Sequence, residues 1–186
     1  GDDSVTANTG NTLIDGGAGN DSLYGNAGQD TLIGGSDNDN LLGYAGGDFL
    51  LGGAGGDYIS GGAASDTIYG GSGDDTAYGD DDDDTLYGED GNDALIGGAG
   101  NDKIYGGAGT DSLYLDAGDD IMDGGTGLDN LYLFNVAGAT KVDLQITGAQ
   151  NTLWGMDTIL GVTQVTGSEF VDTVYGNGEY NYLYGR

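Results

Sequence analysis

Aspartate is the ionisable residue that recurs most regularly in this chain. From Asp21 onward an Asp recurs at every ninth residue: Asp21, Asp30, Asp39, Asp48, Asp57, Asp66, Asp75, Asp84, Asp93, Asp102, Asp111, Asp120 and Asp129. Carboxylate oxygens are the ligands that calcium prefers. The sequence contains no His and no Cys, which are the usual ligands of zinc and copper. The pattern therefore predicts calcium sites built from these thirteen Asp residues.

The charge of the chain narrows the classes of partner. Its 32 acidic and 3 basic residues give a formal net charge of −29, which disfavours nucleic acid and anionic membrane surfaces. No apolar run is long enough for a transmembrane span, and disulfides are impossible without Cys. An enzyme is not expected, because the only groups suited to acid–base or nucleophilic work are carboxylates that the metal would occupy.

A nine-residue repeat positions these Asp residues. Reading from Gly16 in blocks of nine gives thirteen consecutive units, the first being GGAGNDSLY, without insertion or deletion. Position one is Gly in every unit except at Leu115, and position eight is always apolar. Position four is Gly in ten units and is replaced by Asp37, Ala64 and Asp82 in the others. Glycine at this density nearly excludes helix.

Units such as GGAGNDSLY and GGAGNDKIY match the pattern GGxGxDxUx, in which U is a large aliphatic residue, and GGSGDDTAY matches it except for the small Ala77 at U. The chain in this respect resembles the RTX, or haemolysin-type, calcium-binding proteins, whose nonapeptide repeats form a parallel β-helix. The resemblance covers residues 16–132. It implies an all-β fold, a right-handed parallel β-roll with two sheets of short strands and calcium-binding turns, and a bacterial protein that is secreted or held at the cell surface.

The repeat also predicts this geometry on physical grounds. Three residues, such as Ser22–Tyr24, would form a strand with the middle side chain inward, and six residues would turn the chain, with glycines at positions one, two and four permitting positive φ. Two units then make one coil, so alternate Asp residues stack about 4.8 Å apart in two columns. We expect a metal ion in each gap, because neighbouring carboxylates would otherwise repel each other by roughly 3 kcal/mol.

The two columns contain eleven gaps, and we therefore expect about eleven calcium ions. They would bring the formal charge from −29 to about −7, an ordinary value for a soluble protein. The thirteen inward side chains would not bury enough apolar surface to fold the chain alone. We therefore expect a chain that is disordered without calcium and folded with it.

An EF-hand interpretation of the acidic run Asp80–Asp84 fails, because Thr85 stands where the EF-hand loop needs Gly and no helix can flank it. Two interpretations of this run stay open. It is either a charged variant of the repeat turn or an additional surface site for a cation.

Outside the thirteen units the pattern weakens. Residues 1–15 are expected to be degenerate N-terminal repeats, with Thr12 in place of Asp. Residues 133–170 are expected to be an irregular β segment that either caps the roll or continues it as longer coils, and residues 171–186 to be degenerate repeats in which Asn181 replaces Asp. Both termini interrupt a repeat, so we expect a fragment of a larger protein.

These features predict a calcium-binding structural module of a large secreted or cell-surface protein, folding after export. One alternative is a self-assembling surface-layer or adhesin segment, and another is the C-terminal module of a secreted enzyme or toxin. At position nine, Tyr69, Tyr87 and Tyr105 follow one another on one face. They would either stabilise that sheet by stacking or contact another copy, another domain or a carbohydrate.

Overall fold

The computed structural model describes residues 1–133, 138–178 and 180–185. These residues form twenty-one β-strands and no helix, so none of them belongs to a helix that could cross a membrane. The expected segments 133–170 and 171–186 include residues 134–137, 179 and 186, which lie outside the described residues.

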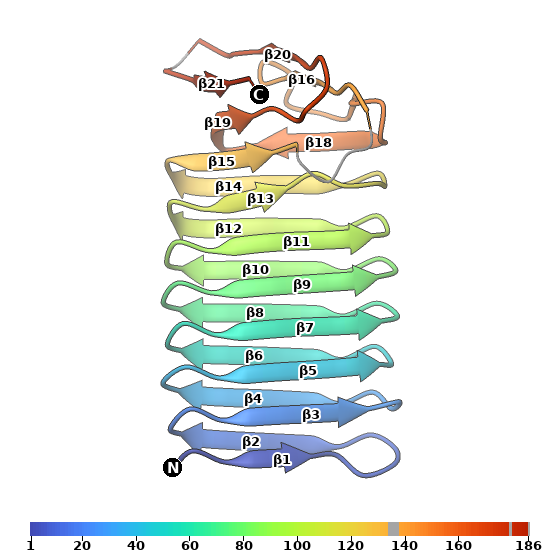
Figure 1. Ribbon diagram of the computed structural model, residues 1–186, viewed down its shortest axis with the longest axis vertical. Coiled ribbons are helices and arrows are strands. Elements are labelled where there is room, and N and C mark those ends of the chain that lie inside the picture. The colour runs from blue at the N-terminus through green and yellow to red at the C-terminus, as the bar shows by residue number, and fades with distance from the viewer. Residues whose placement is uncertain (134–137, 179, 186) are drawn as a thin grey trace.

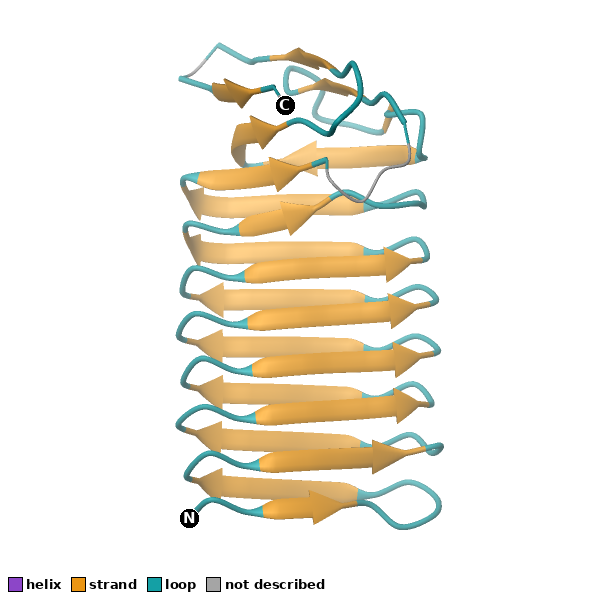
Figure 2. Ribbon diagram, viewed as in Figure 1, coloured by secondary structure: helices purple, strands orange, loops and turns teal. Residues whose placement is uncertain are grey.

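The strands wind into a flattened solenoid with two large sheets facing each other (Figures 1 and 2). One sheet has ten strands, in the order β1 (Ser4–Thr6), β3 (Ser22–Asn26), β5 (Asn40–Ala45), β7 (Tyr58–Ala63), β9 (Thr76–Asp81), β11 (Ala94–Ala99), β13 (Ser112–Tyr114), β15 (Asp129–Tyr132), β19 (Val162–Thr166) and β21 (Tyr182–Tyr184). The other has nine, in the order β17 (Gln150–Asn151), β18 (Met156–Leu160), β14 (Ile121–Gly127), β12 (Lys103–Gly109), β10 (Thr85–Asp90), β8 (Thr67–Ser72), β6 (Phe49–Ala54), β4 (Thr31–Ser36) and β2 (Leu13–Ala18).

The register confirms that two units make one coil. Leu23 pairs with Leu41, and Leu41 pairs with Ile59, always in parallel and one coil apart. The side chains at position eight fill the space between the sheets, and from Leu23 to Leu131 each is 0 % exposed. The predicted all-β parallel solenoid is confirmed. Its core is a stack of apolar side chains, to which each unit contributes one residue.

The strands are longer than the sequence predicted. In β4 and its neighbours they have six residues instead of three, because positions one to three of the following unit also enter the sheet. Gly17 pairs with Gly35 and Ala18 with Ser36 across adjacent coils. The residues that leave the sheet are therefore those at positions four to six. We use the word turn below for positions one to six, which lead from one sheet to the other and end on the Asp.

Positive φ is found at positions two and four and not at position one. Position four keeps the left-handed conformation even without Gly, with φ of 76° at Asp37, 78° at Ala64 and 77° at Asp82. The glycines at position one, such as Gly43, lie outside this region. The expectation that they supply positive φ is wrong, and a different reason for them appears at the metal centre below.

After β15 the chain lengthens one coil. Ile121 of β14 pairs with Thr158 of β18, so that equivalent residues are 37 apart in sequence where the regular coils have 18. Strands β18 and β19 continue the two sheets, whereas β16 (Lys141–Asp143) and β20 (Thr173–Tyr175) form a separate pair at the C-terminal end of the stack (Figure 1).

Candidate metal centre

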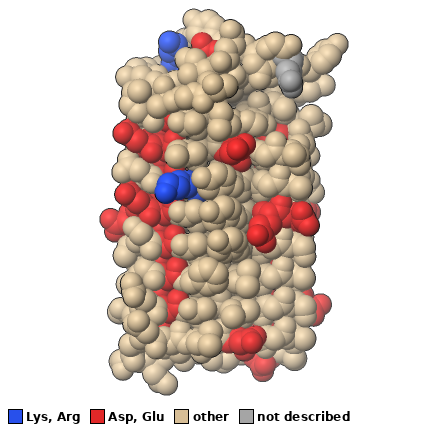
Figure 3. Space-filling view, turned by 180° about the vertical axis from the view of Figure 1, so that it is seen from behind, with Lys and Arg blue, Asp and Glu red and all other residues tan. Residues whose placement is uncertain are grey.

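Each turn delivers its Asp to the edge of the roll, directly before the next strand. All thirteen predicted Asp residues are buried, with exposures from 0 to 4 %. Acidic side chains form a band along one edge of the molecule in Figure 3. Because odd and even units belong to different sheets, the structure places the Asp residues in two columns, one at each edge.

A hydrogen-bond ladder runs along both columns. The backbone N–H of Asp21 donates to Oδ1 of Asp39 at 2.7 Å, and that of Asp39 donates to Oδ1 of Asp57 at 2.8 Å. The same bond, between 2.6 and 2.9 Å long, crosses every one of the eleven gaps. One carboxylate oxygen of each Asp is therefore held by the preceding coil.

The second carboxylate oxygen is different. Oδ2 is buried and has no hydrogen-bond partner in twelve of the thirteen Asp residues: Asp21, Asp39, Asp48, Asp57, Asp66, Asp75, Asp84, Asp93, Asp102, Asp111, Asp120 and Asp129. A buried carboxylate oxygen without a partner is strongly unfavourable. A repeated set of such atoms fits a cation that each of them would coordinate.

The glycine at position one lies beside that oxygen. A Cβ atom built on Gly43 would lie 2.5 Å from Asp48 Oδ2 and 2.5 Å from the carbonyl oxygen of Gly61, in the next coil. The two oxygens are thus separated by no more than two calcium–oxygen bonds of 2.3–2.6 Å. Glycine is required here to keep this space clear for oxygen ligands.

The electrostatics of the columns favour the same interpretation. Burial, followed by the charge of Asp66 and then of Asp102, raises the pKa of Asp84 to about 8, although backbone hydrogen bonding opposes the shift. Burial and the neighbouring carboxylates likewise raise the pKa of Asp75 to about 7. These raised pKa values mean that the two carboxyl groups bind protons more readily than an ordinary Asp does, and a divalent cation would compete with those protons.

One turn satisfies its carboxylate without a cation. In the turn Gly25–Asp30, the backbone N–H of Asn26 donates to Asp30 Oδ2 at 2.8 Å and its side-chain Nδ2 donates to the same oxygen at 3.0 Å. Asn26 does not have the positive φ found at position two of most units. In the coil before it, Thr12 donates its N–H to Asp30 Oδ1 and brings no carboxylate of its own.

Sequence reasoning missed Asp157. Its Oδ1 accepts the N–H of Asp120 at 2.9 Å, so it extends the even column by one residue, and its Oδ2 accepts the hydroxyl of Thr152. The signal was present in GMDTIL, where Gly155, Asp157 and Ile159 occupy positions four, six and eight of a unit.

A second, outer ladder at position five was also missed. The N–H of Asn38 donates to Oδ1 of Asn20 at 3.1 Å, and the N–H of Asn101 donates to Oδ1 of Asp83 at 2.7 Å. The enrichment of Asn and Asp at position five, in seven of the thirteen units, was the available signal. Within the acidic run, Asp83 thus belongs to this ladder and Asp84 to the buried column.

The structure also brings the three predicted tyrosines together. Tyr69 and Tyr87 stack with ring centroids 4.7 Å apart, and Tyr87 and Tyr105 with centroids 5.0 Å apart. Phe49 extends the row at 5.5 Å from Tyr69. The rings are half-buried on the outer face of the nine-stranded sheet.

Comparison with known proteins agrees with this geometry. A search of the curated proteins gave no match. The family model of the RTX calcium-binding nonapeptide repeat (4 copies) matches residues 6–41, 42–77, 60–95, 69–104, 78–113, 96–131 and 166–186. These matches include both the regular units and the last coils. Because they cover well over half of its residues, the chain belongs to the family of RTX calcium-binding nonapeptide repeat proteins.

Proposed function

We propose that this chain is a calcium-binding structural module of a larger secreted or cell-surface protein, and that it folds when it meets calcium. The observation that carries the proposal is the row of twelve buried Oδ2 atoms without a hydrogen-bond partner. Each lies beside a gap of the column, and calcium accepts the flexible, all-oxygen coordination that carboxylates and turn carbonyls offer. The proposed role is structural.

The expected number of ions stays at about eleven. The gap between Asp30 and Asp48 is no longer proposed to bind an ion, because Asn26 already satisfies Oδ2 of Asp30. The gap between Asp120 and Asp157 joins it, because Oδ2 of Asp120 has no partner. The thirteen Asp residues of the repeat remain the proposed ligands, and Asp157 completes the last gap.

The metal requirement supports the proposed extracellular location. Calcium modules that work outside the cell bind with Kd values of about 10⁻⁴ to 10⁻³ M, so a chain of this kind would stay unfolded where calcium is scarce and fold where it is abundant. Folding coupled to metal binding supplies the stability that disulfides give to many secreted proteins.

The test is to remove and restore calcium. Circular dichroism and size-exclusion chromatography of the metal-free chain should show an expanded chain with little β signal, and calcium in excess should restore a compact β protein with about eleven bound ions. Magnesium at the same concentration serves as the control, because its octahedral geometry and shorter bonds fit the gaps poorly. Full β structure at neutral pH after complete removal of calcium would contradict the proposal.

A self-assembling surface-layer or adhesin segment is the second candidate, and the stacked row of Tyr69, Tyr87 and Tyr105 is the observation that favours it. The same sizing experiment distinguishes the two. A calcium-loaded monomer favours the simple module, whereas calcium-dependent multimers favour assembly.

A further inference from the structure

The turn Leu115–Asp120 departs from the repeat at its first two positions. Leu115 stands where every other unit has Gly, and its side chain is 0 % exposed in the core. The strand before it is cut short: β13 ends at Tyr114, whereas its neighbour β11 runs to Ala99. Pairing resumes only at a single bridge between Ala99 and Ala117. The backbone at Asp116 is therefore free of the regular ladder.

Asp116 turns inward as a result. At position two of other units Tyr44, Asp80 and Glu89 have φ of 76°, 80° and 77° and are exposed. Asp116 is not among the residues with positive φ, and it is only 7 % exposed. Its Oδ2 accepts the N–H of Gly98 at 2.8 Å, while its Oδ1 has no hydrogen-bond partner.

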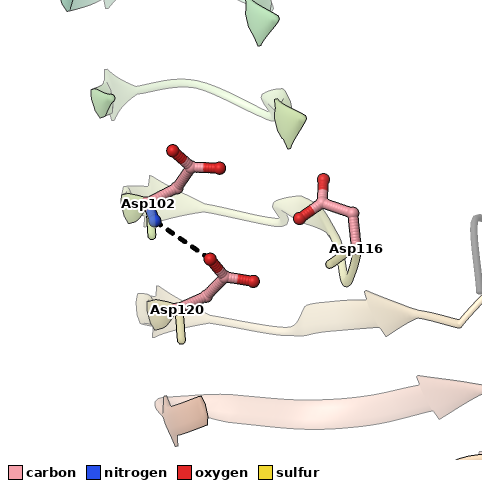
Figure 4. A group of neighbouring side chains, drawn as sticks. All are labelled: Asp102, Asp116 and Asp120. Atoms are coloured by element: carbon pink, nitrogen blue, oxygen red, sulfur yellow. Dashed lines mark hydrogen bonds between the residues drawn. The ribbon is translucent and has the colours of Figure 1, made fainter. Parts of the chain in front are cut away.

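Three carboxylates converge at this point. Figure 4 shows Asp116 facing the pair formed by Asp102 and Asp120. One oxygen from each of the three lies within 4.8 Å of the others, and among the described residues no other group of three acidic side chains meets this distance. The oxygens without a partner are Asp102 Oδ2, Asp120 Oδ2 and Asp116 Oδ1.

We propose that Asp116 makes the gap between Asp102 and Asp120 a three-carboxylate calcium site, and that this site is the tightest of the roll. The separations fit within two calcium–oxygen bonds, about 5 Å in total. The other gaps have two carboxylates from the repeat, and calcium affinity rises with the number of charged ligands. The inference rests on the proposed function, because it ranks one site among those proposed above.

Equilibrium dialysis against buffered free calcium, with bound metal counted by atomic emission, tests this ranking. In the wild type one ion should bind at a free calcium concentration about tenfold below that needed for the others. Asp116→Asn keeps the size of the side chain and an acceptor for Gly98 and removes one charge, so it should abolish this early step while the remaining ions bind as before. Glu89→Gln is the matched control, because Glu89 occupies the same position of its unit and is exposed. It should leave the early step unchanged.

The outcomes distinguish a failure of calcium-dependent folding from a failure of the site proposed at Asp116. A wild type that does not fold with calcium contradicts the proposed function. A wild type that folds with calcium, together with an Asp116→Asn variant that binds its first ion at the same concentration as the wild type, overturns only the present inference. If Asp116→Asn does not fold at saturating calcium, Asp116→Gly supplies the residue that most units carry at position two, and the same loss of the early step is expected. An early step that persists in this variant likewise overturns the inference.

Discussion

Two turns at the same edge of the roll lead from the ten-stranded to the nine-stranded sheet and depart from the repeat at the same position. Asn26 in the first and Asp116 in the second lack the positive φ of their counterparts, and both direct a side chain toward the Asp column. Asn26 gives its N–H and Nδ2 to Asp30 Oδ2. Asp116 adds a third carboxylate beside Asp102 and Asp120.

The difference between these turns shows that the need for a cation is not set by the Asp at position six alone. A side chain at position two that enters the turn either supplies hydrogen-bond donors, which substitute for the metal, or supplies another oxygen, which increases the demand for it. Where position two has positive φ, the backbone directs the side chain away from the Asp column. The gap then needs one cation, as in the regular units.

The largest expected effect is that of pH on the metal-free chain. Burial raises the folded-state pKa of Asp116 to about 8, of Asp84 to about 8 and of Asp66 to about 7. A raised folded-state pKa stabilises the fold below the unfolded-state pKa of about 3.9, and this stabilisation is lost as the pH rises through the folded-state value. Without calcium, β signal in circular dichroism should therefore increase from pH 8 toward pH 4.

This pH response sharpens the comparison of the two turns. Hydrogen exchange in metal-free protein near pH 5 should show stronger protection in the turn Gly25–Asp30 than in the turn Leu115–Asp120, because only the first satisfies its carboxylate with its own donors. With calcium in excess the pH dependence of the β signal should reverse, so that the signal falls as the pH is lowered, since protons then compete with the metal. Metal-free β signal that does not change between pH 4 and pH 8 would contradict the raised pKa values.

A smaller effect is expected from single losses within a column. Asp75 takes part in two gaps, since its Oδ1 accepts the N–H of Asp57 and its own N–H donates to Asp93. Asp129 lies at the end of the regular odd column. Asp75→Ala should therefore lose about two ions and raise the calcium concentration for folding more than Asp129→Ala. Titration calorimetry measures both, and equal losses would argue against stacked, shared sites.

The turn Gly25–Asp30, which carries the amide of Asn26, can be given a carboxylate in its place. Asn26→Asp removes the Nδ2 donor and brings a carboxylate near Asp30, so the metal-free fold should lose about 1–3 kcal/mol and the loaded protein should gain one calcium ion. Asn26→Gly is the matched control, because it restores the residue most frequent at position two without adding charge. It should also gain one ion. If neither variant binds an additional ion, the assignment of Asn26 as a substitute for the metal fails.

The smallest effect concerns the outer face, away from both turns. Changing Tyr69, Tyr87 and Tyr105 together to Thr removes two stacked pairs, each worth about 0.2–1 kcal/mol. We expect a modest rise in the calcium concentration for folding and no change in association. Tyr180→Thr, at a residue that is 94 % exposed, is the control. Loss of association without loss of stability would identify the tyrosines as an interface instead.

The regular part of the fold could be predicted because the repeat specifies it twice, through spacing and through side-chain type. The aliphatic residue at position eight predicted the core stack that Leu23, Leu41 and Ile59 form. The full strand length could not be predicted, since Gly-Gly-Ala has low intrinsic strand propensity. Those residues pair only because the adjacent coils present matching backbone.

The candidate site was predictable in its Asp residues and not in its exceptions. Whether Asn26 and Asp116 enter the turn depends on φ, which the residue type leaves open. Asp157 lies in GMDTIL, a single partial unit outside the thirteen, and its place in the column depends on how the inserted residues fold. The role of glycine at position one was assigned to conformation, whereas contact with Asp Oδ2 in its own unit is what requires it.

The one-dimensional stacking of coils also has a mechanical consequence. The two ends of the chain lie at opposite ends of the stack (Figure 1), and each coil contacts only the next, as in other solenoids. Tension applied to the ends would load the bonds between coils one layer at a time. Each regular layer that peels away releases 18 residues, a contour of about 60 Å, in place of a rise of about 4.8 Å. Over the regular coils, the chain should lengthen in even steps in optical tweezers, and free calcium should set the force at which each step occurs.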